Sequence, residues 1–491
     1  MQSRWNNTDA AQAKTDLDLR AYSSRLIGAD TALVLHGGGN TSVKSTHTDR
    51  FGEKLDIIWV KASGFDLASM GPEGFTALDL RRVLKLAGLE SLSDADMVNE
   101  VLCARLDASA AAASIEAIVH ALIPFKFVDH SHADAILTIS NTPGGKERFA
   151  EIYGDRVLVL PYIKPGFDLA IQFRDVIANT DLSAYDAVIS ENHGVFTFDD
   201  DAFRSYEKMI LVVDEAEAWL RNNYGRAEFT QTDAGDPVGV AAARKGVSDL
   251  AGGAVISRKS KSIPGSNVQR YGALLRKGTL TPEHVIHNKP YPAMLGDDPE
   301  SGLAAFRSEY VGYFGRAEDA DLTMLAPFPH WALFEDGRCR SFGPNLKRAS
   351  VSADVADTTL EAMYYADQIG DWQGLGEQDL RDLEYWELEQ AKLKRQKPAS
   401  ELTGKIAVVS GAAAGIGQAC AEVLFEKGAV VIGLDIDPSI SETMSKPGYE
   451  GLVLDLTDEA AVANALAYVV DNYGGLDIVV SNAGIFRTGA K

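Results

Sequence analysis

Short apolar runs alternate with longer amphipathic stretches over the first half of the chain. The runs have the length and composition of buried strands; they are TALVL (31–35), LDIIWV (55–60), RVLVL (156–160) and DAVIS (186–190). A stretch at residues 203–222 places apolar side chains at helical spacing with charged side chains between them, which predicts a helix. The pattern therefore predicts an α/β domain over residues 1–225.

The middle of the chain, residues 226–398, has a mixed α/β pattern. From Glu377 the sequence has a charged helical pattern, which runs into a Pro-Ala-Ser break. We interpret Lys397–Ser400 as a linker, because proline and small polar residues interrupt regular structure. This range contains no motif to which a chemistry can be assigned.

A regular strand–turn–helix–strand pattern begins after the linker. The run KIAVV (405–409) predicts a central parallel strand, and the turn after it is rich in glycine. Gly411 and Gly415 allow a tight turn, and Gly417, directly after Ile416, allows the next helix to pack close to the sheet. The N-terminus of that helix is expected to face a dinucleotide pyrophosphate.

An acidic residue completes this nucleotide-binding pattern. Asp435 ends the second strand about 20 residues after the glycines, where its carboxylate can accept hydrogen bonds from ribose hydroxyls. The same carboxylate would repel a 2′-phosphate, and neither residues 411–417 nor position 436 contains Arg or Lys. The pattern therefore favours NAD over NADP.

The GxxxGxG spacing of the turn resembles the short-chain dehydrogenase/reductase family. Asp455 follows a third strand, where that family contacts adenine, and Asn482-Ala483-Gly484 matches the family's NAG motif. The resemblance implies a partial Rossmann domain, with a doubly wound parallel sheet, over residues 401–491. The family's catalytic Ser and Tyr-x-x-x-Lys lie downstream of NAG, so we expect a chain truncated within the dehydrogenase domain.

Three histidines in the first domain form a second candidate site. His130 and His132 follow the predicted strand FKFVD, and residues i and i+2 of a strand point to the same face. His193 follows the run DAVIS. Three neutral imidazoles with an open position form the arrangement of a catalytic zinc site. Glu116 is a candidate displaceable fourth ligand and proton acceptor, and His120, one helical turn later, is interpreted as a packing residue.

Two glycine-rich turns precede the histidines. Residues 36–44 (HGGGNTSVK) and 61–64 (KASG) combine free backbone N–H groups with neutral donors, which suits a phosphate. With the residues around Glu116 and the three histidines, these turns resemble the class II aldolase/adducin family, which includes zinc-dependent fuculose- and rhamnulose-phosphate aldolases. The motifs, in chain order, are Gly39-Asn40-Thr41-Ser42, Lys61-Ala62-Ser63-Gly64, Ser114-x-Glu116, His130-x-His132 and Asn192-His193-Gly194.

This resemblance implies a role for each matching residue. Glu116 would be the catalytic acid/base. The Zn²⁺ ligands would be His130, His132 and His193, and the groups that bind the substrate phosphate would be Asn40, Ser63, Gly64 and Ser114. In the sugar-phosphate aldolases two Ser residues precede the Glu, whereas here Ser114 and Ile115 precede it, so one phosphate donor is lost.

The combination of both motif sets resembles bifunctional aldolase/short-chain dehydrogenases of the rhamnulose-1-phosphate aldolase/lactaldehyde dehydrogenase type. It implies zinc-dependent retro-aldol cleavage of a ketose 1-phosphate to dihydroxyacetone phosphate and an aldehyde. The NAD-binding half would act on that aldehyde. The resemblance also implies a homo-oligomer.

Three alternatives stay open at this point. An epimerase of sugar phosphates would use the same zinc site to break and re-form the bond. An NAD-dependent oxidoreductase would use the first half only as a substrate-binding scaffold. A non-enzymatic adducin-like interaction module would bind no metal, although the intact histidine set argues against it.

Charge and cysteine content indicate which kinds of partner and which cellular compartment to expect. The chain has 47 Lys plus Arg and 70 Asp plus Glu, a net charge of −23, which repels nucleic-acid phosphates and anionic lipid. We therefore expect no nucleic-acid and no membrane partner, and a phosphorylated sugar must be bound by local donors. The cysteines Cys103, Cys339 and Cys420 are far apart, and no apolar run has signal-peptide or membrane-spanning length. A cytoplasmic protein is expected.

Overall fold

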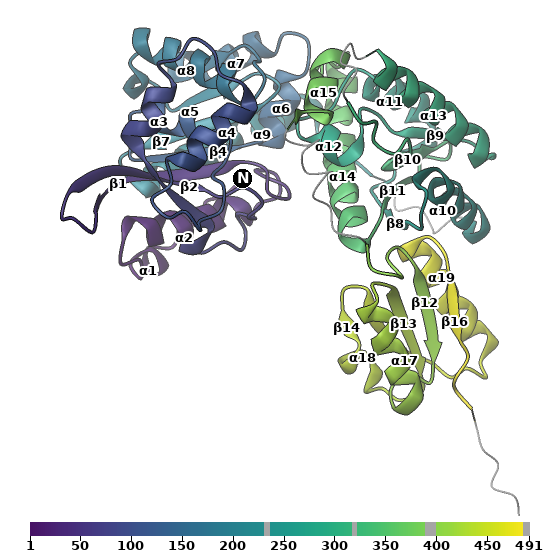
Figure 1. Cartoon of the computed structure of the whole chain (residues 1–491). Coiled ribbons are helices and arrows are strands. Elements are labelled where there is room, and N and C mark those ends of the chain that lie inside the picture. Colours follow the sequence, from purple (N-terminus) through teal and green to yellow (C-terminus); the bar gives the residue numbers. More distant parts are fainter. Residues whose placement is uncertain (230–235, 317–321, 388–398, 485–491) are drawn as a thin grey trace, which may run out of the picture. The chain divides into compact units, whose positions relative to one another are not determined.

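The computed structural model describes residues 1–229, 236–316, 322–387 and 399–484 (Figure 1). The chain divides into two compact units. The first unit contains Met1–Ala227, Lys277–Glu283 and the segment that starts at Glu361. The second unit contains Glu228–Arg276, His284–Leu360 and the C-terminal segment.

A seven-stranded sheet with the order β3-β2-β1-β4-β7-β6-β5 forms the centre of the first unit. Neighbouring strands are antiparallel except β5 and β6, which are parallel. The strands are β1 (Asn40–Thr48), β2 (Lys54–Lys61), β3 (Phe75–Asp79), β4 (Phe127–Ser131), β5 (Val157–Leu160), β6 (Ala187–Ser190) and β7 (Gly194–Asp199).

Helices cover both faces of this sheet, because its strands are apolar on both sides. In β6, Ala187 and Ile189 belong to one apolar core and Val188 belongs to the other. The first core is closed by α2 (Asp16–Gly28), α6 (Asp134–Ser140), α7 (Gly145–Tyr153) and α9 (Ala202–Tyr224). The second is closed by α3 (Leu80–Leu86), α4 (Asp94–Cys103), α5 (Ala117–Leu122) and α8 (Phe167–Asn179). The short helix α1 (Asn7–Ala10) lies near the N-terminus.

Most of the elements predicted for this unit are confirmed, and one is wrong. The runs at 55–60, 156–160 and 186–190 form β2, β5 and β6, and 203–222 lies within α9. Residues 31–35 form turn and coil instead of a strand, although Leu33 and Val34 are fully buried or nearly so. Their side chains pack into the first core without a strand partner, and β1 starts only after the glycine turn.

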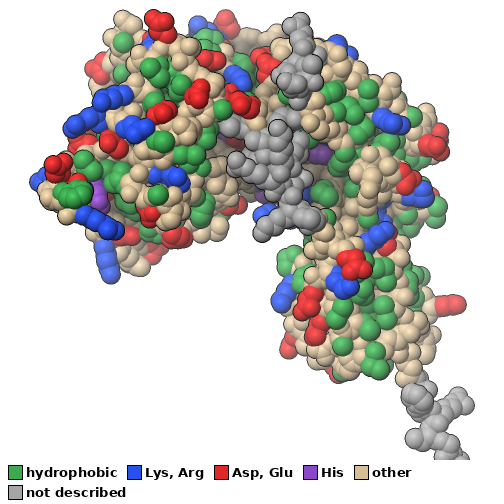
Figure 2. All heavy atoms as spheres, in the orientation of Figure 1, with side chains coloured by type: hydrophobic (Ala, Val, Ile, Leu, Met, Phe, Trp, Pro, Cys, Tyr) green, Lys and Arg blue, Asp and Glu red, His purple; other side chains and the backbone are tan. Residues whose placement is uncertain are grey.

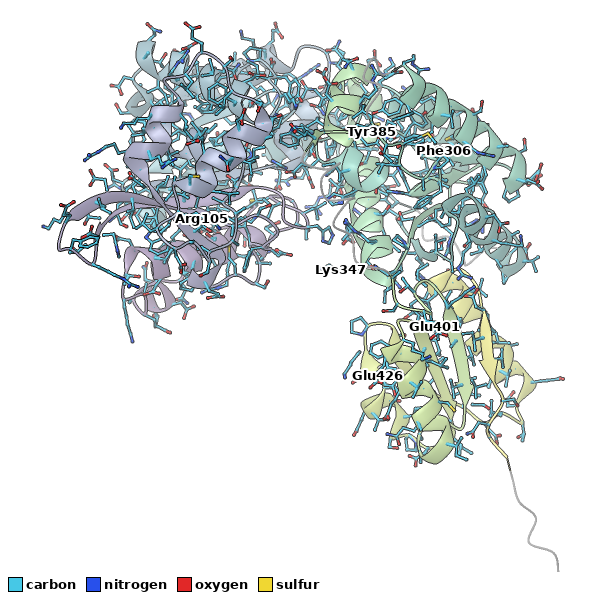
Figure 3. All side chains as sticks on the ribbon, viewed as in Figure 1. Arg105, Phe306, Lys347, Tyr385, Glu401 and Glu426 are labelled. Atoms are coloured by element: carbon cyan, nitrogen blue, oxygen red, sulfur yellow. The ribbon has the colours of Figure 1, made fainter. Side chains whose placement is uncertain are left out.

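The second unit contains a small mixed sheet with the order β8-β11-β10-β9. Its strands are β8 (Ile256–Lys259), β9 (Ala293–Leu295), β10 (Trp331–Phe334) and β11 (Cys339–Gly343), and its helices are α10 (Pro237–Ala251), α11 (Val268–Leu275), α12 (His284–Asn288) and α13 (Pro299–Gly315). On α13, Phe306, which Figure 3 labels, belongs to this region. Its ring stacks on that of Tyr310, with centroids 5.9 Å apart. The mixed pattern expected for the middle of the chain agrees with this arrangement.

One long helix, α14 (Leu346–Ile369), carries the chain from the second unit into the first. The charged helix expected from Glu377 is α15 (Glu377–Glu384), and the buried Tyr385 follows it (Figure 3). The rest of that predicted helix, from residue 388, and the first part of the predicted linker lie outside the described residues.

The C-terminal part of the second unit is a parallel sheet extended by one short antiparallel strand, in the order β14-β15-β13-β12-β16. One face packs against α19 and the other against α17 and α18, as expected for a partial Rossmann domain. The elements are β12 (Ile406–Ser410), α17 (Gly415–Glu426), β13 (Val430–Asp435), α18 (Ile440–Thr443), β14 (Ser445–Lys446), β15 (Tyr449–Val453), α19 (Glu459–Tyr473) and β16 (Ile478–Val480).

This region also exposes apolar side chains. Ile416, Ile436 and Val479 are 76%, 68% and 65% exposed, and Figure 2 shows hydrophobic side chains on the visible surface of this part of the chain. Among the described helices, none combines the length and apolarity that a membrane crossing requires.

Candidate metal centre and dinucleotide site

Strand pairing brings the three predicted histidines to one end of the seven-stranded sheet. His130 lies near the end of β4, and His132 follows that strand. His193 lies in the turn before β7, which pairs antiparallel with β4 so that His130 faces Phe196. The ring of Phe196 stacks on that of His130, with centroids 4.0 Å apart. Antiparallel pairing therefore joins residues that are more than 60 positions apart.

The three imidazoles are close enough to share one cation. Their ligand atoms all lie within 4.8 Å of one another, and all three side chains are buried. His130 Nε2 and His132 Nε2 are 3.1 Å apart. Two nitrogens bound to one tetrahedral zinc at about 2.1 Å would lie about 3.4 Å apart. The spacing therefore fits a zinc ion with little adjustment.

The second nitrogen of each ring supports the same assignment. His130 Nδ1 lies 3.1 Å from the carbonyl oxygen of Val195, so it is the donor nitrogen and Nε2 keeps its lone pair. His132 Nδ1 lies 3.3 Å from Glu283 Oε2, which leaves its Nε2 directed at His130. Among the described residues, His193 Nδ1 is buried with no hydrogen-bond partner. Buried imidazoles with unused lone pairs are the donor set that zinc prefers.

Glu116 lies beside two of the three rings. It precedes α5, and its carboxylate oxygens are 3.2 Å from His193 Nε2 and 3.5 Å from His130 Nε2. The Asn40 amide donates a hydrogen bond of 2.5 Å to Glu116 Oε2. Burial would raise the pKa of Glu116, but the two imidazoles and the Asn40 amide outweigh burial and lower the pKa well below its usual range. Glu116 is therefore held as a carboxylate.

His120, interpreted from the sequence as a packing residue, is buried as expected but also orients Asn40. Its Nε2 hydrogen bonds with Asn40 Oδ1, and its Nδ1 lies 2.8 Å from Ser42 Oγ. Burial lowers the pKa of His120 to about 3, so the ring is neutral. Since the Asn40 amide nitrogen donates to Glu116, the Asn40 oxygen must accept from His120. In the sequence, the spacing of one helical turn between Glu116 and His120 gave no indication that His120 pairs with Asn40 on β1.

Lys61 is a second functional candidate that the motif analysis left without a role. Its ammonium donates hydrogen bonds to the carbonyl oxygens of Gly37 at 2.7 Å and Gly39 at 3.1 Å. These bonds tie the end of β2 to the glycine turn. Burial lowers the pKa of Lys61, although nearby carboxylates, including Glu283, oppose the shift. Lys61 therefore holds the glycine turn that directly precedes Asn40.

The remaining predicted phosphate groups lie on two adjoining backbone segments. Ala62 and Ala113 form a β-bridge, the Ser63 N–H donates to Ala112, and the Ser114 N–H donates to Lys61. Ser63 and Gly64 are exposed and Ser114 is half-buried. Gly64 has φ +85° and open space around its Cα. The segments thus present accessible donors, but a phosphate position remains a prediction.

The predicted dinucleotide groups surround the carboxyl ends of β12 and β16. The strand order reverses at β12, which is where open α/β sheets bind ligands. Helix α17 starts at Gly415 without a side-chain cap, so its first N–H groups are available to a pyrophosphate. A Cβ at Gly417 would lie 2.0 Å from the Gly411 carbonyl oxygen, so only glycine fits there.

Hydrogen bonds hold the other dinucleotide candidates in place. Asp435 accepts hydrogen bonds from the backbone N–H groups of Ala413 (2.9 Å) and Asp437 (3.1 Å). Asn482 donates to the carbonyl oxygens of Ser410 and Gly411. The N–H groups of Asn482 and Ala483 donate to Ser410 Oγ. Ile416 and Gly484 are exposed near this turn and the end of the NAG motif, and Asp455 accepts from Thr457 in an exposed turn.

Three known domain families match successive regions of the chain. Residues 19–220 match "Class II Aldolase and Adducin N-terminal domain" and residues 241–393 match "Aldolase class II, second domain". Residues 405–491 match "short chain dehydrogenase".

Individual relatives agree with this order. The chain is 30% identical to "Uncharacterized oxidoreductase YuxG" of Bacillus subtilis (strain 168), over 98% of this chain and 74% of the relative. It is 46% identical to a 3-oxoacyl-[acyl-carrier-protein] reductase of Vibrio harveyi, over 18% of this chain and 36% of that reductase. A solved N-terminal class II aldolase domain from Thermoplasma acidophilum is 39% identical over 45% of this chain and 100% of that chain, with a TM-score of 0.42. The chain belongs to the family of proteins in which class II aldolase domains are fused to a short-chain dehydrogenase domain.

Proposed function

We propose that the first unit catalyses zinc-dependent retro-aldol cleavage of a ketose 1-phosphate similar to rhamnulose 1-phosphate. The products would be dihydroxyacetone phosphate and an aldehyde. The proposal rests on the convergence of three buried imidazoles beside an ionised Glu116. This arrangement offers nitrogen ligands for a divalent cation and a carboxylate that can exchange a proton at the same place.

When bound by His130, His132 and His193, zinc supplies Lewis-acid polarisation of the substrate carbonyl. As a carboxylate, Glu116 would take the proton of the hydroxyl that becomes the aldehyde oxygen and return it to the carbon of the dihydroxyacetone phosphate half where the C–C bond breaks. Asn40 keeps the Glu116 carboxylate oriented through its 2.5 Å hydrogen bond. Asn40, through the second N–H of its amide, would bind the phosphate together with Ser63, Gly64 and Ser114, and Lys61 lies at the glycine turn.

The dehydrogenase segment is proposed to bind NAD. Action on the aldehyde product would also need the Ser and Tyr-x-x-x-Lys that follow NAG in the family, which residues 485–491 do not contain. NAD supplies a hydride acceptor, or as NADH a hydride donor. The N-terminus of α17 would bind the pyrophosphate, and Asp435 would accept hydrogen bonds from the ribose hydroxyls. Its negative charge favours NAD over NADP.

The direct test is an aldolase assay on rhamnulose 1-phosphate, with released dihydroxyacetone phosphate as the readout. The wild-type protein is expected to contain about one zinc per chain and to release that product. Glu116→Gln should keep the zinc and lose about 10²–10⁴-fold in turnover, as expected for removal of an acid/base group. His130→Ala should lose both zinc and activity. A wild-type chain without zinc, or a Glu116→Gln variant with full turnover, would contradict the proposal.

The description of YuxG as an oxidoreductase favours a second candidate. In it, the protein is an NAD-dependent oxidoreductase and the first unit only binds the substrate. That candidate predicts that His130→Ala leaves NAD-linked turnover of the added aldehyde unchanged and that no sugar phosphate is cleaved. Measurement of both activities on one preparation separates the two.

We further propose a cytoplasmic homo-oligomer. The three free cysteines, Cys103, Cys339 and Cys420, are compatible with a reducing compartment. Analytical ultracentrifugation tests the oligomer, and a monomer at micromolar concentration would contradict it.

A further inference from the structure

A short segment of the second aldolase domain lies within the first unit. Residues Lys277–Glu283 fall inside the range that matches the second domain, yet they belong to the compact unit that holds the histidines. Asn141 Nδ2 donates a hydrogen bond of 2.8 Å to the Leu280 carbonyl oxygen. Trp372 Nε1 donates to the Gly278 carbonyl oxygen at 3.0 Å. The segment is therefore fixed at both its middle and its start.

Asn141, which holds this segment, is also linked through Gln373 to the turn that carries His193. The Gln373 N–H donates to the Asn141 carbonyl oxygen at 2.6 Å. Asn192 Nδ2 donates to the Gln373 carbonyl oxygen at 3.0 Å, and the Asn192 N–H donates to Ser140 Oγ at 2.7 Å. Asn192 has a left-handed backbone, with φ +57°, directly before His193. A residue of the second domain, Gln373, thus contacts the turn that carries His193.

Glu283, the last residue of the segment, contacts the predicted metal ligand His132. Its Oε2 lies 3.3 Å from His132 Nδ1, the ring nitrogen that does not face His130. His132 is buried, whereas the Glu283 side chain is 47% exposed. A Cβ at Gly38 would lie 3.3 Å from Glu283 Oε2 and 3.4 Å from His132 Nδ1, so the glycine turn leaves just enough room for this pair.

We propose that Glu283 is a positioning residue of the metal centre, supplied by the second aldolase domain to the first. Its carboxylate accepts the Nδ1 proton of His132, so Nε2 keeps its lone pair directed at the cation site. The inference rests on the zinc site of the proposed function. A carboxylate that accepts the free N–H of a metal-bound histidine fixes the tautomer and the ring orientation and makes the ligand more basic.

Zinc affinity, measured by competition with a coloured chelator, tests this role without any assay of turnover. Glu283→Ala is expected to weaken zinc binding about 10–100-fold, the usual effect of losing such a partner. Glu283→Gln keeps an acceptor oxygen of the same size and should recover part of the loss. Glu100→Ala is the matched control, because Glu100 is an exposed glutamate of the same unit that pairs with Arg82 at 2.9 Å. It should bind zinc as the wild type does.

Cobalt substitution gives a second readout. Glu283→Ala should shift the visible absorption bands of the Co²⁺ protein, because His132 can then rotate, while Glu283→Gln should stay close to the wild-type spectrum. Zinc affinity within twofold of wild type for Glu283→Ala would overturn the inference and leave the proposed function standing. A wild-type chain that binds no zinc would remove both. If Glu283→Ala does not fold, the nearly isosteric Glu283→Gln decides the case: zinc affinity measurably below wild type supports the inference, and affinity within twofold of wild type overturns it.

Discussion

At the scale of single residues, the chain of hydrogen bonds from Ser42 through His120 and Asn40 to Glu116 has one direction. The Glu116 carboxylate can only accept, so the Asn40 amide must donate and its oxygen must accept from His120. The Nδ1 of the neutral His120 ring then accepts from the hydroxyl of Ser42. Each donor in this buried chain has one defined acceptor, which fixes the carboxylate next to the three imidazoles.

His120→Phe tests this chain of hydrogen bonds. Phe keeps an aromatic ring in contact with the second core but leaves Asn40 Oδ1 and the Ser42 hydroxyl without their partner. Each buried group left without a partner costs about 1–3 kcal/mol. Chemical denaturation should therefore give a lower free energy of unfolding, and aldolase turnover should fall as Glu116 loses its orientation. His47→Phe, at an exposed position on β1, should change neither.

Gly417→Ala tests the nucleotide turn. The added Cβ would lie 2.0 Å from the Gly411 carbonyl oxygen and 2.5 Å from Asn482 Nδ2. The turn and the NAG motif must then separate, so NAD affinity measured by calorimetry should fall at least 10-fold. Gly253→Ala is the control, because nothing lies within 4 Å of its Cβ position and its φ is not positive. Equal NAD affinity for Gly417→Ala and wild type would show that the turn does not bind the dinucleotide.

At the scale of elements, one buried arginine links the second aldolase domain to the dehydrogenase segment within the second unit. Arg244 on α10 donates to the Val255 and Gly404 carbonyl oxygens and pairs with Asp477 at 2.7 Å. Asp477 directly precedes β16, whose end leads to the NAG motif. The position of β16 therefore depends on a residue outside its own domain.

Arg244→Met should destabilise the second unit. The substitution leaves the Val255 and Gly404 carbonyl oxygens without a donor, and each such buried group costs about 1–3 kcal/mol. Asp477 loses its cation at 2.7 Å but keeps the Ile406 N–H at 2.8 Å and Lys405 at 3.6 Å. Lys245→Ala, one residue later, removes an exposed pair with Asp249 and should leave the stability nearly unchanged. Thermal unfolding of the two variants measures the difference. A similar melting temperature for both would contradict the role given to Arg244.

The elements differ in how far the sequence predicted them. The runs that became β2, β5 and β6 were recognisable because their apolar character and length match a strand covered on both faces. Residues 31–35 have the same character, yet Gly37 and Gly39, with φ of +87° and +61°, turn the chain before a strand can form. The local sequence pattern does not distinguish an apolar run that pairs with other strands in a sheet from one that packs against the core as a turn.

The site shows the same limit. The His130, His132 and His193 set was recognisable by residue type and spacing, since histidines at strand ends converge in a sheet. Two orienting roles were not recognisable, that of Asn40 toward Glu116 and that of Glu283 toward His132, because both arise from pairings that join distant parts of the chain. Metal binding itself stays a prediction that the zinc measurements must test.

At the scale of the whole molecule, the net charge of −23 opposes the approach of a phosphorylated substrate. Raising the ionic strength from about 0.01 M to 0.15 M shortens the Debye length from about 30 Å to 8 Å and screens that repulsion. We therefore expect the KM for the sugar phosphate to fall as salt rises over this range. A KM for the sugar phosphate that rises with salt would mean that local cations, such as Lys61, dominate.

The chain passes between the two units after Ala227, Arg276, Glu283 and Leu360. A protease that cleaves between residues 228 and 276 would therefore nick the molecule without releasing the first unit. Non-covalent packing alone would then hold the pieces of the first unit together, and the nicked protein should migrate intact on a native gel while separating on a denaturing one. The two compact units are thus interlaced along the polypeptide, although the dehydrogenase segment follows both aldolase domains.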